Sequence, residues 1–149
     1  MSIADTGLAL TLERDYAIAP DRMWELWTTA EHVAAWLRPS LDAYPPSTCE
    51  ADVRVGGAYR LTIPSATAGE PPMTAYGTYV ELEPPTRLRF TWGWEGDRPD
   101  TTEVEVEITP TDAGCRLRLT HTRLWNAEQL ARHTEGWRGT LESLATLYA

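Results

Sequence analysis

The last quarter of the chain carries the pattern that most restricts how this protein can fold. Upstream of it, apolar and polar residues alternate as in β-strands, but after Asn126 the apolar residues recur at steps of seven, four, three and four, as on one helix face. These residues are Leu130, Trp137, Leu141, Leu144 and Tyr148. Asn126 is a favourable N-cap, and Gln129 completes a capping-box pattern. A long amphipathic helix that follows strands must bury its apolar stripe against a sheet.

The rest of the chain is dominated by strand patterns. Residues 8–18 alternate strongly and predict a long first strand. Later, Val53 and Val55 precede Gly56-Gly57, which is a hairpin signal. Six strands are predicted in this later part, at 49–55, 59–63, 74–82, 88–94, 103–108 and 116–121. The last two resemble a hairpin whose glutamates and arginines share the solvent side of the sheet.

Two short helices are predicted between the first and second strands. Pro20 suits the first turn of a helix, Thr28 and Glu31 form a second capping-box pattern, and Pro39 ends the second helix. This insertion can plug one end of a curved sheet. The chain is therefore predicted to be one α+β domain, residues 1–149, in which an antiparallel sheet of about seven strands curls around the C-terminal helix.

Composition excludes several classes of function. The net charge is −9 and the chain contains no lysine, which disfavours nucleic acid and anionic membranes as partners and excludes Schiff-base chemistry and a P-loop. Cys49 and Cys115 lack the spacing of metal ligands, and no apolar run approaches the roughly 20 residues that cross a bilayer. Nothing at the N-terminus resembles a signal segment. We expect a cytoplasmic protein with reduced thiols, no metal, no cofactor and no membrane partner.

Several short motifs resemble one superfamily over nearly the whole chain. They are Ala19-Pro20, Met23-Trp24, Trp36, Val55-Gly56-Gly57, Gly77, Pro84-Pro85, Arg87-Leu88, Thr91-Trp92, the run from Leu117 to His121, Glu135-Gly136-Trp137, Leu141 and Leu144. In this order they resemble the SRPBCC (START-like) superfamily, and within it the branch named after the activator of the ninety-kilodalton heat-shock protein's ATPase. The resemblance implies the helix-grip fold with a cavity that commonly holds an apolar small molecule. Members include lipid carriers, hormone receptors and polyketide aromatase/cyclases, so the fold alone does not decide the function.

The residues facing the space between sheet and helix are the candidate binding site. Seven tryptophans favour broad, rigid, apolar walls. Arg14, Tyr59 and His121 lie on the inward side of their strands, where they could hold the polar end of an apolar ligand. The predicted cavity residues are Arg14, Tyr16, Tyr59, Phe90, Trp92, Leu119, His121, Trp137 and Leu141. The predicted ligand is an apolar or aromatic small molecule.

Each candidate also has a purely structural explanation. The aromatic rings can simply fill the interior. Arg14 can reach solvent or pair with a carboxylate, Glu81 among them, and His121 can be a structural histidine bonded to a backbone carbonyl. His133 lies one step off the apolar stripe of the last helix, which predicts a position at the surface or at the rim.

Two glycines interrupt the predicted C-terminal helix. Gly136 and Gly139 each cost about 1 kcal/mol relative to alanine in a helix interior. A close approach of the sheet, or of a bend at the cavity mouth, would explain their presence. On this hypothesis, Gly136→Ala is expected to destabilise the protein.

No catalytic motif is present in the sequence. A nucleophile elbow, an HExxH pattern and a glycine-rich phosphate loop are all missing. The enzymatic alternative is a polyketide cyclase or aromatase that uses His121 or Arg14 in the same cavity. A chaperone-associated role through the surface, and assembly into a homodimer, are further alternatives that the sequence leaves open.

Overall fold

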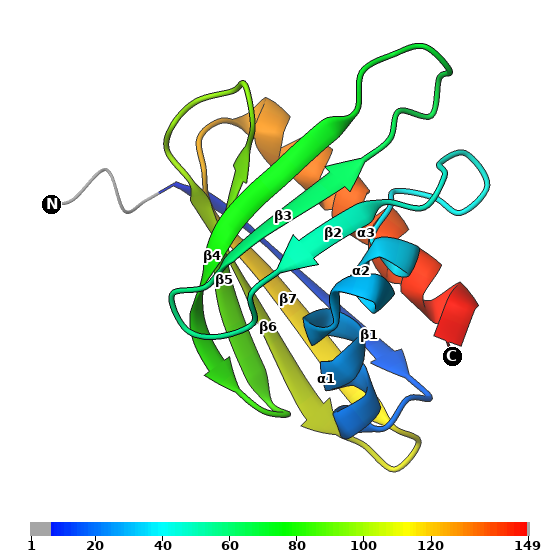
Figure 1. Ribbon diagram of the computed structural model, residues 1–149. Helices are drawn as coiled ribbons and strands as arrows, with labels where there is room; N and C mark the ends of the chain where they lie inside the picture. The colour runs from blue at the N-terminus through cyan, green and yellow to red at the C-terminus, as the bar shows by residue number, and fades with distance from the viewer. Residues whose placement is uncertain (1–6, 149) are drawn as a thin grey trace, which may run out of the picture.

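The computed structural model describes residues 7–148, which form a curved seven-stranded antiparallel sheet and three helices (Figure 1). The strand order is β1-β7-β6-β5-β4-β3-β2, so β1 pairs with β7 and every later strand pairs with its neighbour in the chain. The elements are β1 (Leu8–Tyr16), α1 (Pro20–Thr28), α2 (Ala30–Trp36), β2 (Thr48–Ala51), β3 (Ala58–Ile63), β4 (Met73–Glu83), β5 (Arg87–Trp94), β6 (Thr102–Pro110), β7 (Cys115–Leu124) and α3 (Ala127–Tyr148). The predicted fold class and order of elements are confirmed.

Helix α3 packs against the inner side of the sheet, as its apolar stripe predicts (Figure 1). The Asn126 Oδ1 atom accepts a hydrogen bond of 2.8 Å from the Gln129 backbone N–H, which caps the helix. Trp137, Leu141 and Leu144 are buried, and each such side chain contributes roughly 1.5–3 kcal/mol. No helix within residues 7–148, α3 included, has the length and apolar character that a bilayer crossing requires.

The start of helix α2 differs from the prediction. The helix begins at Ala30 and has no side-chain cap, because the Thr28 hydroxyl instead donates to the Trp24 carbonyl oxygen at 2.7 Å within α1. The predicted capping box of Thr28 and Glu31 is therefore wrong. Trp36 is fully buried and donates from its indole N–H to the Leu26 carbonyl oxygen at 2.7 Å, which ties α2 to α1.

The strand predicted around Val53 and Val55 ends earlier. Strand β2 stops at Ala51, and the two valines lie in the connection to β3 with exposed fractions of 38% and 65%. The Gly57 N–H donates to the Arg54 carbonyl oxygen at 2.8 Å and closes a tight turn, in which Gly56 has a φ of +85°. The glycine pair thus makes the turn, but the valines leave the sheet.

The two glycines of α3 have different surroundings. A Cβ atom at Gly136 would meet no heavy atom within 4 Å beyond its own helix, whereas one at Gly139 would lie 2.0 Å from the Pro39 carbonyl oxygen. A close approach therefore occurs at Gly139, but it is made by the segment after α2 and not by the sheet. The expectation for Gly136 is wrong.

Charged side chains pair across the outer side of the sheet. Arg87 bonds Glu105 at 2.8 Å and Arg89 bonds Glu103 at 3.3 Å, both between β5 and β6. Arg116 of β7 bonds Asp15 of β1 at 2.8 Å. Because these groups are partly or largely exposed, each pair contributes at most about 1 kcal/mol.

Candidate functional site, an aromatic pocket beside helix α2

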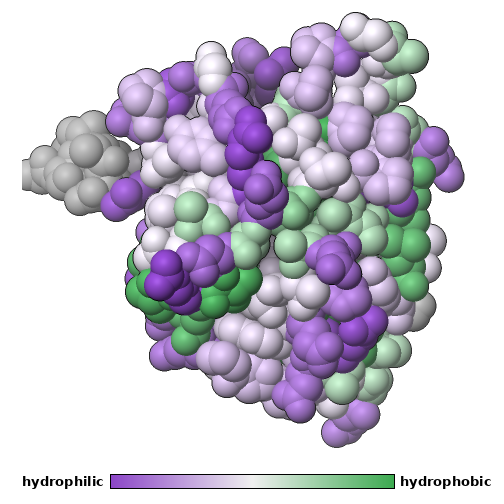
Figure 2. Space-filling model, viewed as in Figure 1, coloured by the Kyte–Doolittle hydropathy of each residue, from purple (hydrophilic) through white to green (hydrophobic). Residues whose placement is uncertain are grey.

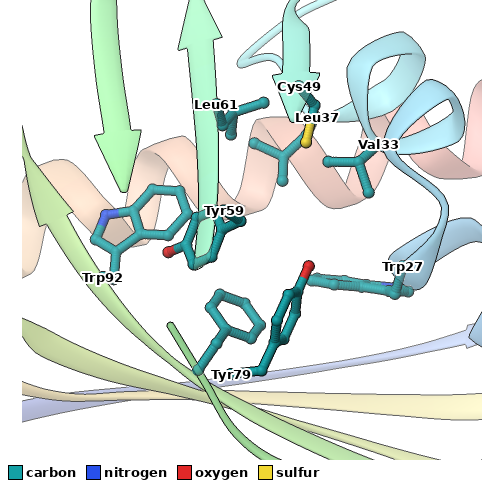
Figure 3. A pocket seen from close by; sticks show the side chains of 9 residues that line it. Trp27, Val33, Leu37, Cys49, Tyr59, Leu61, Tyr79 and Trp92 are labelled. Carbon is teal, nitrogen blue, oxygen red and sulfur yellow. The ribbon is translucent and has the colours of Figure 1, made fainter. Parts of the chain in front are cut away.

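A small cavity lies between the α1–α2 insertion and strands β2 to β5 (Figure 3). Its volume is about 30 Å³, which is room for one or two water molecules. Five of the nine residues around it are aromatic. The lining residues are Trp27, Val33, Leu37, Cys49, Tyr59, Leu61, Tyr79, Phe90 and Trp92.

The aromatic walls hold one another in place. Tyr59 is the central ring: its centroid lies 5.6 Å from that of Phe90, 5.8 Å from that of Tyr79 and 6.5 Å from that of Trp92. The Tyr59 hydroxyl donates to the Thr91 carbonyl oxygen at 2.5 Å, which fixes the ring. Such tilted and edge-to-face contacts are the favourable geometries for aromatic pairs. This wall is therefore rigid.

Two polar groups face the cavity without a hydrogen-bond partner among residues 7–148: the Tyr79 hydroxyl and the Cys49 thiol (Figure 3). Burial raises the pKa of the Tyr79 hydroxyl above its ordinary value. Burial, with a smaller effect of Glu50, raises the pKa of the Cys49 thiol to about 11. Both groups are therefore protonated at neutral pH, so Tyr79 offers a hydrogen-bond donor to the cavity.

The lining contains no charged side chain. Within residues 7–148, no group of three or more His, Cys, Asp or Glu side chains is placed to hold a metal ion. The pocket therefore offers apolar contact, aromatic ring faces and weak hydrogen-bonding groups. These favour binding of an apolar molecule.

A second polar cluster joins α3 to the sheet. The Trp137 indole N–H donates to His121 Nδ1 at 3.0 Å. His121 Nε2–H donates to Thr102 Oγ1 at 2.6 Å, because that hydroxyl gives its own hydrogen to the Trp92 carbonyl oxygen at 3.0 Å. Desolvation, with a smaller effect of His133, lowers the pKa of His121 to about 3. His121 is thus neutral, and both of its ring nitrogens are bonded to protein atoms.

His133 belongs to the same cluster, so the prediction of a surface or rim position is wrong. It is buried because Trp94 of β5 covers this end of α3 and donates from its indole N–H to His133 Nε2 at 3.1 Å. His133 Nδ1–H donates to the Gln129 carbonyl oxygen at 2.7 Å. The rings of His121 and His133 lie 4.9 Å apart, and desolvation lowers the pKa of His133 too.

At the C-terminal end of β1, two candidate residues contact α3. The Arg14 guanidinium forms an ion pair with Glu142 at a partly exposed position. Glu81 lies elsewhere and pairs with Arg89 at 3.1 Å, so the Arg14–Glu81 pair does not form. The Tyr16 hydroxyl donates to the Leu141 carbonyl oxygen at 3.0 Å. These contacts hold helix α3 against strand β1.

The structure thus divides the predicted cavity residues into two groups. Tyr59, Phe90 and Trp92 line the pocket. The other six lie in the packing between α3 and the sheet: Arg14, Tyr16, Leu119, His121, Trp137 and Leu141. No residue of α3 lines the pocket, which is bounded instead by the helical insertion.

Six lining residues were not among the sequence candidates: Trp27, Val33, Leu37, Cys49, Leu61 and Tyr79. The apolar stripes of the two short helices indicated that Trp27, Val33 and Leu37 face inward, because helices that cover one end of the sheet must turn their apolar side towards it. Tyr79 was hidden because Tyr79 and Val80 are both apolar, and an irregularity between Tyr79 and Glu81 shifts the register there.

Solved structures share this fold. Protein CV1439 from Chromobacterium violaceum has a TM-score of 0.80 at 24% identity, over 93% of this chain and 95% of that one. The AHSA1 protein SPO3351 from Silicibacter pomeroyi has a TM-score of 0.77 at 26% identity, over 93% and 96%. CalU16 from Micromonospora echinospora has a TM-score of 0.69 at 24% identity, over 93% and 74%. No curated protein matches the chain significantly.

The sequence also matches a family model over most of its length. The model is described as activator of Hsp90 ATPase homolog 1-like protein, and it matches residues 17–149. Together with the shared architecture, this confirms the resemblance to that branch of the SRPBCC superfamily. The protein therefore belongs to the activator of Hsp90 ATPase homolog 1-like family.

Proposed function

We propose that this protein binds a small apolar or aromatic molecule in the pocket beside α2. One observation carries the proposal: aromatic side chains from α1, β3, β4 and β5 converge on one cavity that has no charged lining. Aromatic and aliphatic walls with a few polar groups are the usual composition of small-molecule sites. Membership of a superfamily that includes carriers and cyclases supports the same proposal.

Ligand entry requires one wall of the pocket to move. The cavity volume of about 30 Å³ is far below the roughly 150 Å³ of a cavity that accepts benzene. Tyr59 and Phe90 belong to internal strands of the sheet, whereas Val33 lies on α2, a helix of seven residues without a side-chain cap. We therefore assign the movement to α2, in a minor open state that the ligand stabilises.

Binding can be followed through the indole N–H signals of Trp27 and Trp92 in NMR spectra. α-Methylstyrene, an uncharged apolar aromatic probe, is expected to shift both signals in a saturable way with one site per chain. Val33→Phe should weaken this binding at least tenfold, because the larger side chain fills the cavity from the α2 side. Signals of tryptophans outside the lining should shift less.

Val80→Phe is the matched control, because the same change is made at a partly exposed position that does not line the pocket. It should leave binding of α-methylstyrene unaltered. The proposal fails if the wild-type protein shows no saturable shift. It also fails if a folded Val33→Phe protein binds the probe as tightly as the wild type.

We propose binding rather than catalysis because His121 and Arg14, the residues of the enzymatic alternative, are engaged with protein partners. We also assign the protein to the cytoplasm, since Cys49 and Cys115 are both free thiols, as reducing compartments favour. The oxidation state of the two cysteines in the native host would test this assignment.

A second candidate is contact with a chaperone, as the family description suggests. Val55 is 65% exposed and Val53 38%, and Figure 2 shows hydrophobic surface where the β2–β3 connection lies. Exposed apolar patches often mark protein contacts. If this patch binds a purified ninety-kilodalton heat-shock protein, Val55→Asp should abolish binding measured by calorimetry, whereas Met73→Asp at another exposed apolar site should not. Wild-type protein that gives no heat of binding would exclude this candidate.

A further inference from the structure

We infer that the Tyr79 hydroxyl selects the ligand, and that the pocket takes an uncharged aromatic molecule carrying one hydrogen-bond-accepting oxygen, as in an aryl ketone. The inference rests on the proposed binding function and adds the chemical class of the ligand. It follows from the hydrogen bonds of the lining residues, in which the Tyr79 hydroxyl takes no part.

The two tyrosines of the lining differ in a single respect. Tyr59 and Tyr79 are 8% and 7% exposed, but the Tyr59 hydroxyl donates to the Thr91 carbonyl oxygen, whereas the Tyr79 hydroxyl has no partner within residues 7–148. Figure 3 shows the Tyr79 hydroxyl directed across the cavity towards Leu37 and Val33. Unlike the indole N–H groups of Trp27 and Trp92, this hydroxyl is not cut off from solvent, so water can bond it while the pocket is empty. A ligand that displaces this water must replace its hydrogen bond, and a ligand oxygen that accepts from Tyr79 does so.

The rest of the lining has two donors without partners among residues 7–148, and its acceptors are the phenol oxygen of Tyr59, which already donates to Thr91, and the Cys49 sulfur. The indole N–H groups of Trp27 and Trp92 also lack partners in the described part of the chain. Both indole nitrogens are cut off from solvent, and Figure 3 shows the Trp92 nitrogen on the ring edge away from Tyr59, so the Tyr79 hydroxyl is the donor that a ligand in the cavity can reach. The Cys49 thiol is a weak donor and a weak acceptor. The Tyr79 oxygen can also accept a hydrogen bond, but the unpaired groups of the lining are mostly donors, so a ligand acceptor is the better complement.

The charge of the lining excludes ionic ligands. None of the nine lining side chains is charged. A carboxylate or an ammonium group would lose its hydration without gaining a counter-charge, which is strongly unfavourable. A carbonyl or ether oxygen loses much less hydration, and one hydrogen bond from Tyr79 replaces it.

Acetophenone and α-methylstyrene provide a direct test, because they have nearly the same shape and differ in a carbonyl oxygen against a methylene group. The quantity to measure is the Kd of α-methylstyrene divided by the Kd of acetophenone, from the indole N–H titrations. Tyr79→Phe should lower this ratio about two- to tenfold, the value of one neutral hydrogen bond. Binding of α-methylstyrene itself should survive the substitution.

Tyr76→Phe is the control, because Tyr76 lies on the same strand but on its outer side, over Gly93. It should leave the ratio unchanged. An unchanged ratio in a folded Tyr79→Phe protein that still binds α-methylstyrene overturns the inference while leaving the proposed function intact. Benzoate that binds the wild type as tightly as acetophenone overturns the uncharged class. If α-methylstyrene does not bind the wild type at all, the proposed function fails, and this inference fails with it.

Discussion

Two glycines three positions apart in α3 should respond in opposite ways to the same substitution. Gly136→Ala is expected to raise the free energy of unfolding by up to about 1 kcal/mol, because the added methyl group meets open space and alanine favours the helix. Gly139→Ala should lower it by more than about 1 kcal/mol, because the methyl group would meet the Pro39 carbonyl oxygen, a backbone atom. Urea unfolding of both variants measures this. Changes of the same sign in both would contradict the packing described for Pro39.

At the scale of elements, local sequence signals predicted that the helices exist. They did not predict the helix boundaries and the side-chain burial that depend on contacts with other elements. Helix α3 was predictable because its cap and its apolar spacing are both local. The cap proposed for α2 failed because the Thr28 hydroxyl had a nearer acceptor, the Trp24 carbonyl oxygen one turn back in α1. His133 was misplaced because its burial depends on Trp94, a residue of a strand distant in the sequence.

The pocket was only partly predictable for the same reason. Tyr59, Phe90 and Trp92 could be assigned inward because their strands alternate regularly. Tyr79 could not, since the register shift beside it interrupts the alternation in β4. The sequence also could not show that the helical insertion, rather than α3, closes the cavity, because that depends on how the insertion packs.

At the scale of the whole molecule, stability depends on keeping two histidines uncharged between α3 and the sheet. Protonation of His121 at Nδ1 would set its new N–H against the Trp137 indole N–H. Protonation of His133 at Nε2 would do the same against Trp94. Because both rings are also desolvated, the folded protein resists these protons, whereas the unfolded chain binds them near pH 6.5, the ordinary pKa of histidine.

This difference predicts a loss of stability in mild acid. The pKa of His121 is lowered from 6.5 to about 3 on folding, so the unfolded state binds more protons between these values and the free energy of unfolding falls as pH falls. For His121 alone, the loss from pH 6.5 to 5.5 should be about 1 kcal/mol, approaching about 1.4 kcal/mol per unit below that. Asp15 and Glu95, whose pKa values are lowered by Arg116 and Arg60, act at lower pH. Urea unfolding at pH 7.5, 6.5 and 5.5, with NMR titration of the His121 ring, measures both quantities. Constant stability over this range, or a His121 ring that titrates near pH 6.5 in the folded protein, would show that burial between α3 and the sheet does not hold this histidine neutral.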